Sequence, residues 1–128
     1  MGNPPGIPAV GTSRARAVLR AVFRLEANEA GAGRFETAYH LLAAAMHLAD
    51  WLGDDAALAE VERRATDRQR TLDLPPGPGR AAHHLSSAAA AKRGTVALFT
   101  SLSRILEATR ARLHARAALG PHGGQTPP

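Results

Sequence analysis

The sequence predicts an all-α protein, and three observations favour that class. Ala and Leu are frequent, aromatic residues make up only 4% of the 128 residues, and β-branched residues are scattered. The prolines and glycines gather at the two ends and in one internal stretch, so the segments between them are left to form helices. A chain of this length fits one domain. We expect a small antiparallel bundle of three shorter helices and one long C-terminal helix.

The first helix is expected over residues 13–30, after a disordered Pro/Gly-rich tail over residues 1–12. Ser13 is a suitable N-cap, and the glycines at 31 and 33 end the helix. One side of this segment is marked by residues at helical spacing, namely Ala15, Leu19, Val22, Phe23 and Glu26.

The second and third helices are expected over residues 34–52 and 54–73, with Gly53 as the left-handed residue between them. Asp54 and Asp55 put negative charge at the start of the third helix. Four arginines follow in its later turns, which suits both ends of the helix dipole. They are Arg63, Arg64, Arg68 and Arg70.

The fourth helix is expected over residues 81–119, or from a cap at Ser86 or Ser87, after a Pro/Gly linker over residues 74–80. A disordered tail is expected over residues 120–128. The apolar side of this helix is wide enough to pack against two neighbours. It consists of Leu98, Phe99, Leu102, Ile105, Leu106, Thr109 and Leu113.

Charge is segregated along the chain, which has a net charge of +5. The segment 14–25 holds four arginines and no acid, 26–73 holds ten acids and five arginines, and 80–116 holds seven bases and one acid, giving 4 − 5 + 6 = +5. Basic flanks around an acidic centre indicate attraction within the fold, a basic face for an anionic partner, or both.

A stretch of the second helix resembles a known repeat. The residues that carry the resemblance are Gly33, Phe35, Ala38, Leu42, Ala45, Leu48 and the ending Trp51-Leu-Gly-Asp54. They are similar to the second helix and exit turn of a tetratricopeptide-type repeat, and the likeness covers one unit, Ala21 to Asp54. Glu26 departs from the family pattern, and no second copy follows. The resemblance implies a repeat-like helical hairpin and a protein-binding role.

One polar stripe on the second helix has side chains that metals use as ligands: Glu36, His40, His47 and Asp50. At 100° per residue they share one side of the helix, but His40 and His47 lie about 10 Å apart along its axis, so one ion cannot take all four. Further ligands from another helix would be needed. The alternative is a solvent-facing stripe, which we favour, and no cofactor is expected.

The fourth helix is basic and gives a second hypothesis, non-specific binding of nucleic acid. Its cations are Lys92, Arg93, Arg104, Arg110, Arg112 and Arg116. Such a helix follows phosphates without any motif. Against this, the arginines project in different directions, and neither interleaved aromatics nor a helix-turn-helix pattern is present.

Catalytic motifs are not evident, because the chain has no cysteine, no phosphate-binding loop and no nucleophile elbow. The first residues do not form a signal peptide, and the most apolar stretch, 88–106, is interrupted by Lys92, Arg93 and Arg104. We therefore expect a cytoplasmic protein without enzymatic activity or membrane contact.

The leading hypothesis is a helical interaction module that binds itself or another helical protein through apolar helix faces. The expected contact residues lie on the fourth helix and are Leu98, Phe99, Leu102, Ile105 and Leu106. The alternative for these side chains is the core of the bundle itself. Nucleic-acid binding and metal binding remain the other two hypotheses.

Overall fold

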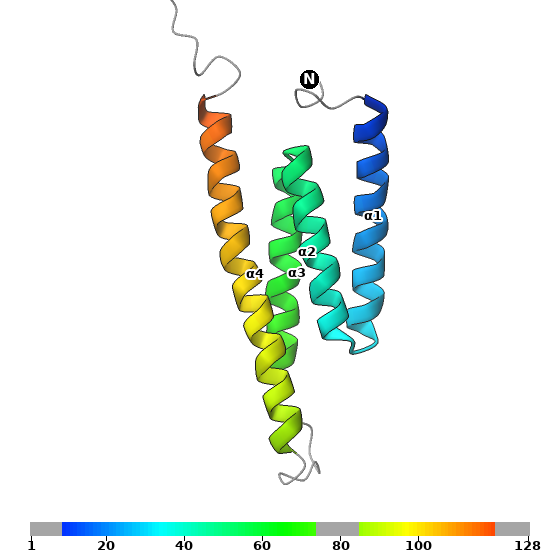
Figure 1. Cartoon of the computed structure of the whole chain (residues 1–128), viewed down its shortest axis with the longest axis vertical. Helices are drawn as coiled ribbons and strands as arrows, with labels where there is room; N and C mark the ends of the chain where they lie inside the picture. Colours follow the sequence, from blue (N-terminus) through cyan, green and yellow to red (C-terminus); the bar gives the residue numbers. More distant parts are fainter. Residues whose placement is uncertain (1–8, 74–84, 120–128) are drawn as a thin grey trace, which may run out of the picture.

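The computed structural model describes residues 9–73 and 85–119, and the side chains of residues 11–73 and 91–119. Four helices follow one another in this part of the chain: α1 (Ala9–Gly31), α2 (Phe35–Leu52), α3 (Asp55–Asp73) and α4 (Leu85–Leu119). Consecutive helices run antiparallel, and α4 is the longest with 35 residues (Figure 1). The predicted all-α class and the long C-terminal helix are confirmed.

The helix bounds agree with the sequence for α2 and α3 to within one residue. The prediction is wrong for α1, which begins at Ala9, so residues 9–12 belong to the helix and Ser13 is not its N-cap. Thr12 is buried in register with Ala15 and Leu19, which shows that tertiary packing extends the helix beyond the expected cap. The other residues of the predicted N-terminal tail, 1–8, lie outside the described residues.

The start of α4 differs from the expected residue 81. The helix begins at Leu85, directly before the alternative caps at residues 86 and 87, and continues through Gly94. Residues 81–84, the linker 74–80 and the tail 120–128 lie outside the part of the chain that the structure describes.

The turn between α2 and α3 is as tight as the sequence predicts. Gly53 has φ 66°, a left-handed conformation that glycine adopts without strain, and the Asp54 N–H donates to the Ala49 carbonyl oxygen at 2.9 Å. The Asp54 carboxylate then accepts a hydrogen bond from the Ala57 N–H at 3.0 Å and caps α3. Helix α2 therefore ends and α3 begins within two residues.

Helix α2 is the centre of the bundle and contacts each of the other three helices. Its alanines at 38, 45 and 49 are fully buried, so neighbouring backbones can approach closely. The largest buried apolar side chains come from α2, α3 and α4 and are Leu42, Leu58, Val61, Phe99, Leu102 and Leu106. Burial of each stabilises the fold by about 1.5–3 kcal/mol.

The bundle is open, because α1 and α4 lie on opposite sides of the pair α2 and α3 (Figure 1). Helix α1 packs mainly on α2, whereas α4 packs on α3 and α2. The outer faces of α1 and α4 are therefore not covered by any helix of the described chain.

Candidate binding surface

The acidic centre of the sequence is largely neutralised inside the molecule. Glu26 of α1 is fully buried, and its carboxylate accepts hydrogen bonds from Arg64 (3.0 Å) and Arg68 (2.7 and 2.8 Å) of α3. Arg64 also donates to the Phe23 carbonyl oxygen at 2.7 Å, and its guanidinium lies 4.7 Å from the centre of the Phe23 ring. A buried carboxylate is tolerated here because two cations and several donors surround it.

A second set of ion pairs joins α3 to α4. Arg110 donates to Asp55 at 2.9 and 3.2 Å and to Glu62 at 2.8 Å, while His114 lies 2.9 Å from Asp55. Hydrogen bonds from Arg110, and then from His114, lower the pKa of the Asp55 carboxyl to about 2. Internal attraction, one of the two explanations for the segregated charge, is thus present in the structure.

The six cations that the sequence suggested for nucleic-acid binding fall into two groups, those bonded within the bundle and those that line a surface hollow. Arg110 is held by two acids, and Arg116 lies 3.7 Å from Asp50 of α2. Arg112 donates to the Thr109 hydroxyl at 3.2 Å. Two of the six cations, Arg110 and Arg116, are therefore engaged by acids of the bundle itself.

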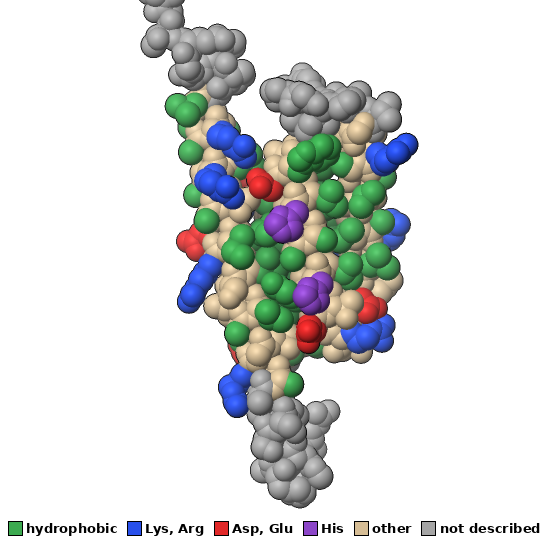
Figure 2. Space-filling model, in the orientation of Figure 1, with side chains coloured by type: hydrophobic (Ala, Val, Ile, Leu, Met, Phe, Trp, Pro, Cys, Tyr) green, Lys and Arg blue, Asp and Glu red, His purple; other side chains and the backbone are tan. Residues whose placement is uncertain are grey.

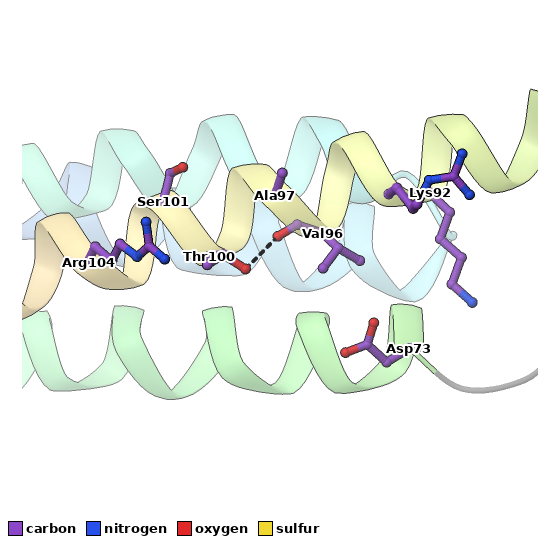
Figure 3. Close-up of a pocket in the computed structure, with 8 residues that line it drawn as sticks. Asp73, Lys92, Val96, Ala97, Thr100, Ser101 and Arg104 are labelled. Atoms are coloured by element: carbon purple, nitrogen blue, oxygen red, sulfur yellow. Dashed lines mark hydrogen bonds between the residues drawn. The ribbon is translucent and has the colours of Figure 1, made fainter.

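The other three of the six, Lys92, Arg93 and Arg104, line one hollow between α4 and the end of α3. The hollow has a volume of about 680 Å³. Figure 3 shows Lys92 and Arg104 at opposite ends and Asp73 of α3 across from them. Its floor includes Val96 and the Thr100 hydroxyl, which accepts from Gln69 at 2.8 Å and donates to the Val96 carbonyl oxygen at 3.0 Å. The hollow combines an apolar floor with a basic rim.

The expected contact residues of α4 fall into two groups. Phe99, Leu102 and Leu106 are buried in the core, where the Phe99 ring meets the Tyr39 ring edge to face at 5.9 Å. The prediction that these three form a contact surface is wrong, because α2 and α3 cover them. Leu98 is half-buried, and Ile105 is 49% exposed, so only these two remain available.

The sequence analysis named Leu98 and Ile105 as contact residues but did not separate the stripe to which they belong from the core side of α4. This stripe lies one residue before each core position, so it points about 100° away from the core. Its spacing alternates three and four residues, the pattern of a helix-packing seam, and this periodicity was the signal available in the sequence. We call it the outer seam; it consists of Leu98, Ser101, Ile105, Ala108, Arg112, Ala115 and Leu119. All but the half-buried Leu98 are exposed.

Exposed apolar side chains also occur on the other helices. On α1 they are Val18, 46% exposed, and Leu25, and on α2 Trp51 is 52% exposed. The α1 side chains belong to the outer face of that helix, and Leu25 lines a shallow hollow with Ala21 and Asn28. Arg24 also lines that hollow, whereas three cations, Lys92, Arg93 and Arg104, line the hollow beside α4.

The polar stripe of α2 stays on the surface. His40 and His47 are exposed, and Figure 2 shows histidine side chains on the face that carries α2, with cationic side chains toward the α1 and α4 edges. Asp50 is engaged by Arg116. Within the described residues, no three His, Cys, Asp or Glu side chains come together as a set of metal ligands.

A scan against protein-family models, a search of curated proteins and a search of solved structures each found no match. The resemblance of residues 21–54 to a tetratricopeptide-type repeat therefore stays a prediction. Among the helices that the structure describes, none is long and apolar enough to cross a bilayer.

Proposed function

We propose that this chain is a non-enzymatic helical module that binds a helix of another polypeptide or of a second copy. One observation carries the proposal: the outer seam of α4 exposes Ile105 and Leu119, and no helix of the described chain covers it. Apolar side chains at alternating spacings of three and four are what a second helix packs against. Exposed alanines and a serine between them let its backbone approach closely.

The expected affinity is modest. Ile105 and Leu98 are already about half-buried in the free protein, so each contributes on the order of 1 kcal/mol when a partner covers it. Association itself costs several kcal/mol of lost freedom. The seam alone therefore supports only weak binding of a neutral helix.

A direct test uses a fluorescein-labelled synthetic peptide of about 18 residues, about 27 Å long as a helix. It carries Leu on one face and Gln on the other, and its anisotropy is followed as the full chain is added. We expect Ile105→Ser to weaken binding about tenfold. Val18→Ser removes an equally exposed apolar side chain from α1 and should leave binding unchanged.

Light scattering over a range of protein concentrations tests the second-copy form of the proposal. A dimer that Ile105→Ser dissociates, and Val18→Ser does not, supports self-association through the same seam. A protein that stays monomeric, and whose peptide binding responds equally to both variants, would overturn the proposed function.

The basic hollow favours a second candidate, non-specific binding of nucleic acid through Lys92, Arg93 and Arg104. This candidate predicts binding of an unstructured DNA oligonucleotide that weakens steeply with salt. Nucleic acid copurifying with the chain, detected by the ratio of absorbance at 260 and 280 nm, provides the first check.

A further inference from the structure

The cations around the outer seam are in excess over the acids that could pair with them. Arg93 and Arg104 are exposed and make no ion pair with any described residue, and Arg112 bonds only to the Thr109 hydroxyl. Arg104 directly precedes Ile105, and Arg112 lies seven residues after it in the seam itself. Positive charge therefore lies within the outer seam at Arg112 and beside it at Arg93 and Arg104.

The acids of the chain are mostly committed elsewhere. Glu26, Asp55 and Glu62 hold arginines of α3 and α4 inside the bundle. The acids that make no ion pair with another described residue are scattered over three helices and form no stripe. They are Glu36 on α2, Asp67 and Asp73 on α3, and Glu107 on α4.

A second copy is therefore a poor occupant of this face. In a two-fold arrangement the seam of α4 would meet the same seam, and Arg104 and Arg112 would approach arginines of the other copy. Like charges across an interface cost affinity and exclude wrong partners.

From this charge distribution we infer that the occupant is an acidic amphipathic helix of a different protein. Its apolar side packs on Leu98 and Ile105, and its carboxylates pair with Arg93 and Arg104 at the rim of the hollow. Arg93 and Arg104 are eleven residues apart, about 16 Å along α4, so carboxylates three turns apart on the partner reach both. The inference rests on the proposed function and specifies its partner.

The hollow suits such a helix better than a nucleic acid. None of its described lining residues is aromatic, so bases would find no stacking surface. Asp73 also lines the hollow and repels any anion beside it, so the carboxylates of the partner are expected at Arg93 and Arg104 and not next to Asp73.

The experiment compares three versions of the labelled amphipathic peptide, with Glu, Gln or Lys on the polar face, and a single-stranded DNA oligonucleotide of the same charge as the Glu peptide. Binding to the full chain is measured by anisotropy at low and high salt. We expect the Glu peptide to bind about tenfold more tightly than the Gln peptide at low salt, and the Lys peptide most weakly. The advantage of Glu should shrink at high salt because screening weakens exposed charge pairs.

The double variant Arg93→Glu, Arg104→Glu tests the assigned residues and should remove the advantage of the Glu peptide. Its matched control is Arg14→Glu, Arg20→Glu, which makes the same change in net charge on exposed arginines of α1. The control should keep most of the advantage. All four positions are exposed, so circular dichroism should show unchanged helix content.

The possible results distinguish the acidic-partner inference from the proposed helix-binding function on which it rests. Equal affinity for the Glu and Gln peptides, with both weakened by Ile105→Ser, would overturn the acidic partner and leave the helix-binding function intact. Tighter binding of the DNA, lost in the Arg93 and Arg104 double variant, would replace the acidic helix with a nucleic acid. Binding of no probe by a monomeric chain would reject the proposed function itself.

Discussion

The interior of the bundle and the outer seam of α4 both contain apolar residues and arginines, but these residues lie in different environments. In the interior, Phe99 is fully buried, and the buried Glu26 is matched by Arg64 and Arg68. On the outer seam Ile105 is half exposed, and beside the seam Arg104 makes no ion pair among the described residues. In the interior, the apolar and charged side chains thus find their partners within the single chain. The seam instead carries exposed apolar area and charge that do not contribute to the packing of the bundle.

The largest difference in the effect of a substitution on stability is expected between the two apolar faces of α4, the core side and the outer seam. Phe99→Ala should lower the free energy of unfolding by about 4 kcal/mol, because it removes a fully buried ring and its contact with Tyr39 and leaves a cavity. Ile105→Ala should cost about 1 kcal/mol or less. Urea unfolding followed by circular dichroism measures both, and similar losses would contradict the division of α4 into two faces.

Removal of the buried carboxylate of Glu26 should give the next largest loss of stability. Glu26→Ala should destabilise the fold by about 3 kcal/mol, since Arg64 and Arg68 lose their common partner inside the bundle. The loss stays at the lower end of the usual range because both arginines keep about a fifth of their side-chain surface in solvent. Glu107→Ala on α4 is the control and should change the unfolding midpoint little. A small effect of Glu26→Ala would mean that the ion pairs of the interior stabilise no more than surface charges do.

Glu26 also shows how far the sequence leads. Helical spacing placed this acid on the same side of α1 as Leu19 and Phe23, and in the structure Leu19 and Glu26 are both buried. Its partners lie 38 and 42 residues away on α3. No local pattern identifies them, because their pairing depends on how α1 and α3 approach in space.

The same limit applies to α4. Periodicity predicted a long helix with a wide apolar side, and the structure has both, although the helix begins at Leu85 and not at residue 81. It did not separate Phe99 from Ile105, since a wide apolar side does not reveal which part the neighbouring helices cover. That division follows from the open arrangement, in which α1 and α4 stay apart (Figure 1).

Lowering the pH tests how much the ion pairs between α3 and α4 contribute to the stability of the fold. The pKa of the Asp55 carboxyl is lowered from 3.8 to about 2, first by the Arg110 hydrogen bond and then by that of His114. A folded-state pKa below the unfolded one stabilises the fold above about pH 4, and this stabilisation is lost as the pH falls toward 2. Asp55→Asn should therefore lower the melting temperature at pH 5, and the difference from wild type should vanish near pH 2.

The control for this pH dependence is Asp67→Asn, which changes an exposed acid of α3 that makes no ion pair with a described residue. Its melting temperature should follow that of wild type across the same range. A gap between Asp55→Asn and wild type that stays constant down to pH 2 would show that the Asp55 carboxylate does not stabilise the link between α3 and α4. The effect is smaller than that of Glu26→Ala because the Asp55 side chain is more than a third exposed.

The smallest change in the free energy of unfolding is expected at Gly94, on the exposed side of α4. This change should be an increase, unlike those of the variants above. The helix passes through this glycine, and a Cβ built there meets no atom within 4 Å. Gly94→Ala should raise the free energy of unfolding by about 0.5–1 kcal/mol, because alanine loses less backbone freedom on entering a helix. Gly53→Ala is the contrasting variant, since φ 66° at that turn strains any side chain, and it should destabilise. If Gly94→Ala also destabilised the isolated chain, this side of α4 would be packed against something in solution, and its description as uncovered would fail.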